Sequence, residues 1–153
     1  MHKLFCCLLF VLSTQGFSQT EKIFRITSSF TSFPDTARAN GHSYNNVLYS
    51  NAEHYSDSTV MIIVPPQLKT KKQVDLVFWF HGWRNNIDSA AASFILVKQF
   101  LSSHRNAILV LPETTKDAPD SYGDKLEQEN IFKELLNDVL DKLKKEKIIG
   151  KKI

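Results

Sequence analysis

Cysteine is almost absent from this chain of 153 residues, because its two cysteines, Cys6 and Cys7, both lie close to the amino terminus. Beyond them there is no disulfide framework, no thiol nucleophile and no cysteine-based zinc site. No two of its five histidines lie four residues apart, which argues against a metal site on a helix. A glycine-rich phosphate loop is also lacking. The chain is therefore expected to need neither a metal nor another cofactor.

The first apolar run is too short to remain as a membrane span. It covers residues 4–12, follows Lys3 and leads to small residues before Ser18 and Gln19. A basic start, a short apolar stretch and small residues at the exit are typical of a secretory signal peptide. We therefore predict a signal peptide over residues 1–19, cleaved after Ser18 or Gln19. A lipid anchor on one of the cysteines is the weaker alternative, because no small residues precede them.

Cleavage would leave residues 20–153 as a secreted or periplasmic domain. An exported domain without cysteine fits a bacterial envelope or medium better than an animal secretory pathway. The loss of Lys3 reduces the basic residues from 19 to 18 against 16 acidic ones, a net charge of +2. Many of the lysines lie in residues 142–152, where they alternate with acidic residues as on a solvated helix face. Neither a nucleic-acid partner nor a permanent membrane span is expected.

Strand and helix patterns alternate through the chain, which predicts an α/β fold. Strands are expected at residues 23–27, 60–64, 74–80 and 107–111, with a possible short strand at 47–49. The nearly continuous apolar run at 74–80 predicts a strand buried on both faces. Helices are expected at about 88–103, capped by Asp88 or Ser89, and at 131–147. In the first helix, one face is expected to hold Ala90, Phe94, Val97 and Leu101.

The most informative segment is the turn that follows strand 74–80. It reads His81-Gly82-Trp83-Arg84-Asn85-Asn86 and leads into a helix. Backbone N–H groups at such a turn point out of the sheet, where they can hold an anion or a developing oxyanion. An apolar strand that ends in His-Gly resembles the oxyanion loop of the α/β-hydrolase family.

That resemblance implies a role for each of the first three residues. The backbone N–H of Trp83 would donate to the oxyanion, Gly82 would permit the tight turn, and His81 would brace the loop. The side chains expected to line the entrance and meet polar substrate groups are those of Arg84, Asn85 and Asn86. A plain structural turn with a solvated charge is the alternative for this segment.

A second candidate loop, residues 113–125, leaves the carboxyl end of strand 107–111. That edge of a parallel sheet is where α/β proteins bind ligands, and the loop is longer than most such connections. The family resemblance implies that it shapes the acyl or alcohol pocket. The candidate side chains are Asp117, Asp120, Ser121 and Tyr122. A solvated surface loop is the alternative.

The resemblance covers residues 20–153 and implies only part of an α/β-hydrolase domain. The fold would be a three-layer α/β/α arrangement with a mixed, mostly parallel sheet in the order 1-2-4-3-5. Strand 74–80 would then lie between strands four and five, and without strand five its bare edge would favour aggregation. The family's Gly-x-Ser-x-Gly nucleophile motif does not occur in these residues.

The predicted function is therefore the amino-terminal portion of a secreted, esterase-like serine hydrolase. It would supply the oxyanion loop for a small-molecule or polymer ester, and it would be inactive alone without nucleophile, acid and catalytic histidine. One alternative is a non-enzymatic exported module that binds a ligand such as a sugar or peptide. Another is a truncated product with no function of its own.

Overall fold

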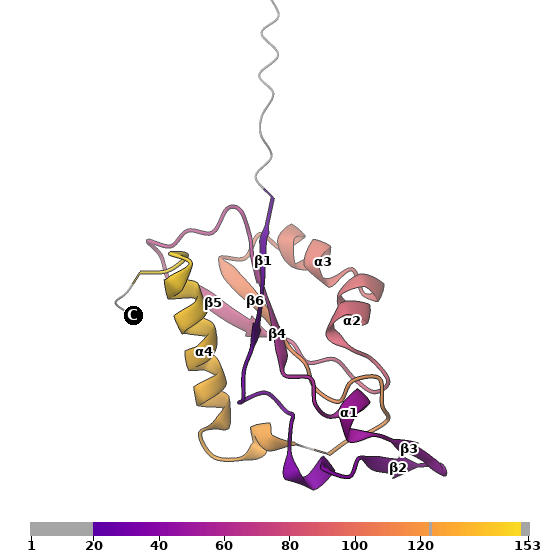
Figure 1. Ribbon diagram of the computed structural model, residues 1–153. Helices are drawn as coiled ribbons and strands as arrows, with labels where there is room; N and C mark the ends of the chain where they lie inside the picture. The colour runs from indigo at the N-terminus through magenta and orange to yellow at the C-terminus, as the bar shows by residue number, and fades with distance from the viewer. Residues whose placement is uncertain (1–19, 123, 151–153) are drawn as a thin grey trace, which may run out of the picture.

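The structure is a computed structural model that describes residues 20–122 and 124–150 (Figure 1). Its main sheet has the strand order β1 (Lys22–Thr27), β4 (Thr59–Val64), β6 (Ala107–Pro112) and β5 (Asp75–Phe78). The predicted α/β class is confirmed. Of the three strand pairs in this sheet, as described, β5 with β6 is parallel and the other two are antiparallel. The sheet is thus mixed, but it is not mostly parallel as predicted.

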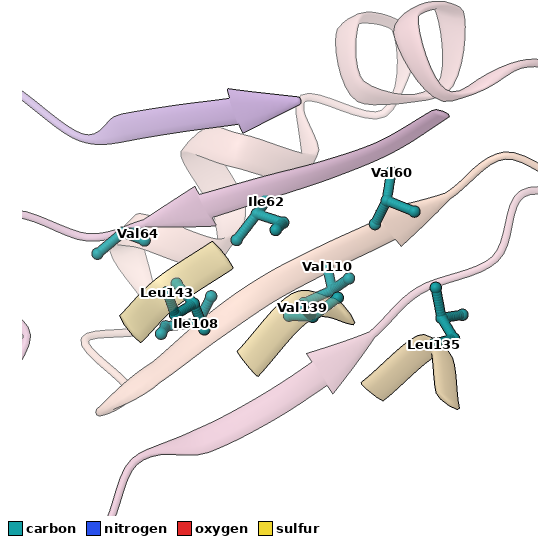
Figure 2. Close-up of a cluster of buried hydrophobic side chains, with 8 residues drawn as sticks. All are labelled: Val60, Ile62, Val64, Ile108, Val110, Leu135, Val139 and Leu143. Carbon is teal, nitrogen blue, oxygen red and sulfur yellow. The ribbon is translucent and has the colours of Figure 1, made fainter. Parts of the chain in front are cut away.

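The two faces of the sheet carry different helices because successive strand residues point in opposite directions. In β4, Val60, Ile62 and Val64 lie with α4 (Ile131–Lys145), which contributes residues spaced four apart. Figure 2 shows that cluster, completed by Ile108 and Val110 of β6. On the opposite face, Met61 and Ile63 pack toward α2 (Ile87–Ser93) and α3 (Leu96–Ser102).

Short elements fill the segment between β1 and β4. They are the 3₁₀ helix η1 (Thr36–Arg38), the strands β2 (His42–Tyr44) and β3 (Val47–Tyr49), and helix α1 (Asn51–His54). The possible strand at residues 47–49 is confirmed as β3, whereas its partner β2 was not predicted. Asn45 and Asn46 both have positive φ, which is the conformation of a tight hairpin turn. A second 3₁₀ helix, η2 (Lys125–Glu127), precedes α4.

The helix predicted at residues 88–103 is interrupted. Ile95, with φ of 53°, separates α2 from α3, so residues before and after it no longer share one helical phase. Phe94 therefore lies half exposed instead of on the buried face, while Ile87 and Ala90 are buried. The cap also differs from the prediction: the Asn86 side chain accepts a hydrogen bond from Ser89 N–H at 2.8 Å.

Strand β5 is the edge of the sheet in the described part of the chain. It pairs only with β6, and Val77 is 42% exposed, so burial of this strand on both faces was a wrong prediction. The apolar composition reflects one face packed under α4, where Leu76 and Phe78 lie. None of the helices in residues 20–122 and 124–150 is long and apolar enough to cross a membrane. The predicted signal peptide, residues 1–19, lies outside the described residues.

The bare edge of β5 leads to a prediction about solution behaviour. We expect the isolated 153-residue chain to be oligomeric or poorly soluble, because unpaired backbone groups and apolar side chains lie together there. Val77→Lys should shift the chain toward monomer, whereas Val47→Lys on the β2–β3 hairpin should not, although Val47 is also exposed. Size-exclusion chromatography with light scattering measures the shift. A monodisperse wild-type monomer with a cooperative melt would count against the prediction.

Candidate functional site

The two candidate loops lie side by side at the carboxyl ends of the parallel strands β5 and β6. Pairing continues beyond β5, where Trp79 N–H donates to the Val110 carbonyl at 2.9 Å. The loops are then joined by two further backbone bonds, from Arg84 N–H to Ala118 O at 3.1 Å and from Asp117 N–H to Asn85 O at 2.8 Å. Segments more than thirty residues apart in sequence thus form one surface.

A pocket of about 400 Å³ opens between these loops and η2. Six of the ten site residues predicted from sequence line it, namely His81, Gly82, Trp83, Asp120, Ser121 and Tyr122. The remaining lining residues are Phe80, Thr114, Thr115, Ala118, Asp124, Leu126 and Glu127. Both loops therefore contribute to a single concavity at the sheet edge where α/β proteins bind ligands.

The other three predicted entrance residues do not line the pocket. Arg84 is exposed and has a positive φ of 51°, which turns the chain after Trp83. Asn85 uses its backbone carbonyl to hold Asp117. Asn86 caps α2, and its amide donates to the Asp117 carboxylate at 2.8 Å. Asp117 also does not line the pocket, and its contacts with Asn85 and Asn86 join the two loops.

Trp83 is a lining residue of the pocket that carries a backbone donor and an exposed aromatic side chain. Its backbone N–H donates to no acceptor among residues 20–122 and 124–150. Its indole is 53% exposed, and the Tyr44 ring of β2 meets it edge-on at a centroid distance of 5.8 Å. A backbone donor without a partner in the described chain is available to an external acceptor.

His81 is held on both ring nitrogens. Nδ1 lies 2.9 Å from the Gly82 carbonyl oxygen, and Nε2 forms a short contact with the Glu113 carboxylate. The His81 side chain is fully buried and that of Glu113 is 2% exposed. The second Glu113 oxygen accepts from Ile87 N–H at 3.2 Å, at the start of α2. One carboxylate therefore ties the end of β6 to the turn after β5 and to α2.

This geometry fixes the proton count of the pair. A carbonyl oxygen only accepts, so Nδ1 carries a proton and donates it to Gly82. A second proton lies between Nε2 and the Glu113 carboxylate, so the ring donates from both nitrogens. Burial alone would lower the pKa of His81, but the hydrogen bonds to Glu113 and Gly82 outweigh it and raise the pKa.

His81 is consequently poorly arranged as a general base. Thr114 Oγ1 lies 3.0 Å from His81 Nε2, yet that nitrogen is already engaged by Glu113, and Nδ1 is engaged by Gly82. A serine-hydrolase base needs one ring nitrogen facing the nucleophile and the other facing the acid. The side chain instead joins the turn after β5 to the end of β6 through these two contacts. In the part of the chain that the structure describes, no group of three or more His, Cys, Asp or Glu residues could hold a metal ion.

Asp120 forms an ion pair with Arg38, a residue that was not predicted from the sequence. Arg38 Nε and Nη2 lie 2.6 and 3.1 Å from the two Asp120 oxygens, and the guanidinium also stacks 4.4 Å from the Tyr122 ring centre. Burial alone would raise the pKa of Asp120, but the bonds from Arg38 and from Tyr122 N–H lower it. The ion pair fixes the loop that forms the pocket wall.

Glu113 and Arg38 were the two supporting residues absent from the sequence-based candidates. Glu113 had a signal, because a carboxylate directly after a fully apolar strand is costly to bury without a partner. Arg38 had none, since it lies 82 residues from Asp120 in an irregular polar segment. Comparison of the chain with protein-family models, with curated proteins and with solved structures gave no match. Its function therefore has to be argued from the site itself.

Proposed function

We propose that this chain is the amino-terminal portion of a secreted ester hydrolase of the α/β-hydrolase type. It supplies the oxyanion donor and part of the substrate pocket. The observation that carries the proposal is the Trp83 N–H, which has no acceptor among the described residues and lies on a turn lining the 400 Å³ pocket. Donors held in place for charge that develops only during the reaction are a large source of catalysis in acyl transfer.

The sheet supports the same proposal. Taken in chain order, the strands of the main sheet lie in the order 1-2-4-3, the order the family resemblance implies for its first four strands. Helices α2 and α3 on one face and α4 on the other are consistent with the three-layer arrangement of that family. The bare edge of β5 is the position at which the family's next strand would pair.

The hydrogen bonds of His81 determine which catalytic role this residue can take in the proposed hydrolase. Because both of its ring nitrogens are engaged, the proton in the reaction would be carried by another histidine. A serine on a Gly-x-Ser-x-Gly turn, which these 153 residues lack, would attack the acyl carbon. The Trp83 N–H and the amide beside that serine would then hold the oxyanion.

Two measurements test this proposal. The purified 153-residue chain is expected to show no turnover of p-nitrophenyl acetate above buffer, because it contains no nucleophile motif. Reading the coding DNA downstream of the Ile153 codon is expected to show Gly-x-Ser-x-Gly, in frame or after a frameshift. Turnover by the contaminant-free chain would contradict the inactive-alone prediction. Unrelated downstream sequence after a true stop codon would contradict the hydrolase proposal.

A second function, an exported ligand-binding module, is favoured by one separate observation. The pocket joins the exposed aromatic side chain of Trp83 to the hydroxyls of Thr115 and Ser121, and such a lining can hold a ligand without any catalytic group. Unrelated downstream sequence together with ligand binding by the 153-residue chain would support this second function over the first.

A further inference from the structure

We propose that the pocket between the two loops binds a neutral saccharide ring, stacked on Trp83 and hydrogen-bonded by the loop that follows β6. As a statement about substrate it rests on the proposed hydrolase function, whereas as a statement about binding it rests only on the pocket. The observations behind it are the charges, the hydrogen-bonding groups and the apolar surface of the lining residues.

The charges of the lining argue against an anionic ligand. Three carboxylates line the pocket, those of Asp120, Asp124 and Glu127, and no lysine or arginine is among the lining residues. Arg38 is occupied by Asp120, so an anionic ligand would meet the carboxylates of Asp124 and Glu127 without a free cationic partner, which costs binding free energy. Sugar acids, phosphates and sulfates are therefore unfavourable occupants.

The same carboxylates make a weak receptor for a cation. Asp120 is already neutralised by the bidentate contact with Arg38, at 2.6 and 3.1 Å. Asp124 uses one oxygen to accept from Leu126 N–H at 2.7 Å, and burial raises its pKa. Glu127 alone is exposed and screened by solvent. The lining carboxylates therefore act mainly as hydrogen-bond acceptors and attract a cation only weakly.

An acceptor-rich lining selects a ligand that donates. Carboxylate oxygens only accept, while the hydroxyls of Thr115 and Ser121 both donate and accept. A ligand with several hydroxyl groups and no charge satisfies both kinds of group without a desolvation penalty for an ion. Polyols, and sugars above all, have that chemistry.

Trp83 supplies the apolar surface that distinguishes a ring from an open polyol. Its indole is 53% exposed, and contact with the Tyr44 ring edge restricts it. Phe80 and Leu126 add apolar area to the same pocket. A pyranose ring presents an apolar C–H face with hydroxyls around its rim, which matches a held aromatic surface beside a polar loop. Because the Trp83 side chain is already restricted in the free protein, it loses less conformational entropy when a ligand binds.

The test is calorimetric titration of the 153-residue chain with a panel of neutral tetrasaccharides: cellotetraose, xylotetraose, mannotetraose and maltotetraose. We expect measurable binding of at least one of them. Trp83→Ala should weaken that binding about tenfold or more, and Trp83→Phe, which keeps a smaller ring, should weaken it less. The matched control is Phe94→Ala, since Phe94 is an aromatic of similar exposure, 50%, outside the pocket.

Tetragalacturonate and choline serve as the anionic and cationic probes. The inference is overturned by preferential binding of either probe, by failure of every neutral tetrasaccharide to bind the folded chain, or by unchanged binding in Trp83→Ala. Thermal melts of all variants verify folding, and the exposed position of Trp83 leaves the core intact. Binding is measured here without turnover, while p-nitrophenyl acetate carries no sugar. Failure of the saccharide inference is therefore distinguishable from failure of the hydrolase proposal.

Discussion

Replacing Glu113 by glutamine is expected to lower the free energy of unfolding by about 3 kcal/mol. Glutamine has nearly the same size, so the change removes charge without opening a cavity. The lost carboxylate accepts from the buried His81 ring and from the N–H groups of Ile87 and Thr114. While His81 carries protons on both ring nitrogens, a single amide oxygen cannot accept from the imidazolium and from the Ile87 N–H as two carboxylate oxygens do, so a buried donor is left unpaired. Urea denaturation followed by circular dichroism measures the loss.

The size of this effect should depend on pH, with a sign set by His81. Its pKa is raised above the ordinary 6.5, so the stabilising contribution is fully present below about pH 6.5. It is lost as the pH rises through the higher pKa of the folded state, where Nε2 or Nδ1 gives up its proton and one hydrogen bond disappears. Glu113→Gln should therefore cost more at pH 6 than at pH 9.

A matched variant separates the stability loss in Glu113→Gln from the effect of removing any negative charge. Glu129 is an exposed glutamate just before α4, and Glu129→Gln should change stability by no more than about 0.5 kcal/mol at either pH. Equal losses in the two variants, or a Glu113→Gln loss that grows with rising pH, would contradict the stabilising role given to the hydrogen bond between His81 and Glu113.

At acid pH both proteins should also lose stability, because Asp57 and Asp120 have lowered pKa values. Their ion pairs are lost as the pH falls below about 3.8 and through the lower pKa values of the folded state.

Local sequence patterns predicted the main strands and the two loops that line the pocket. The segment from Val60 to Val64 is apolar throughout and is followed by Pro65 and Pro66, which leaves a buried strand as its simplest structure. The turn after β5 and the loop after β6 were both selected because each follows a strand pointing toward the same edge. Their convergence on one pocket depends only on the parallel pairing of β5 and β6.

Contacts between distant segments were beyond such patterns. Arg38 reaches Asp120 from an irregular segment, and Tyr44 reaches Trp83 from a hairpin strand that has no apolar alternation. The break at Ile95 was missed for a different reason. An isoleucine is unusual at positive φ, so no residue there signalled that one helical face would become two. Strand β5 looked doubly buried because composition does not distinguish a central strand from an edge strand.

The backbone donor at Trp83 gives the second large expected effect, in the hydrolase that the proposed function requires. Trp83→Pro removes the N–H and should lower kcat for p-nitrophenyl acetate by a factor of about 10² to 10³. Trp83→Ala keeps the N–H and loses only the indole, so its kcat for this small ester should stay near the wild-type value.

Stability data decide whether the Trp83→Pro loss is catalytic. The Trp83 N–H donates to no acceptor in residues 20–122 and 124–150, so its removal breaks no hydrogen bond there. The melting temperature should therefore change little while kcat falls, since the N–H would act only when an oxyanion forms. If kcat falls equally in Trp83→Pro and Trp83→Ala, the indole and not the amide carries the effect. If kcat is unchanged in Trp83→Pro, the turn after β5 is a structural element and the pocket beside it is a binding site alone.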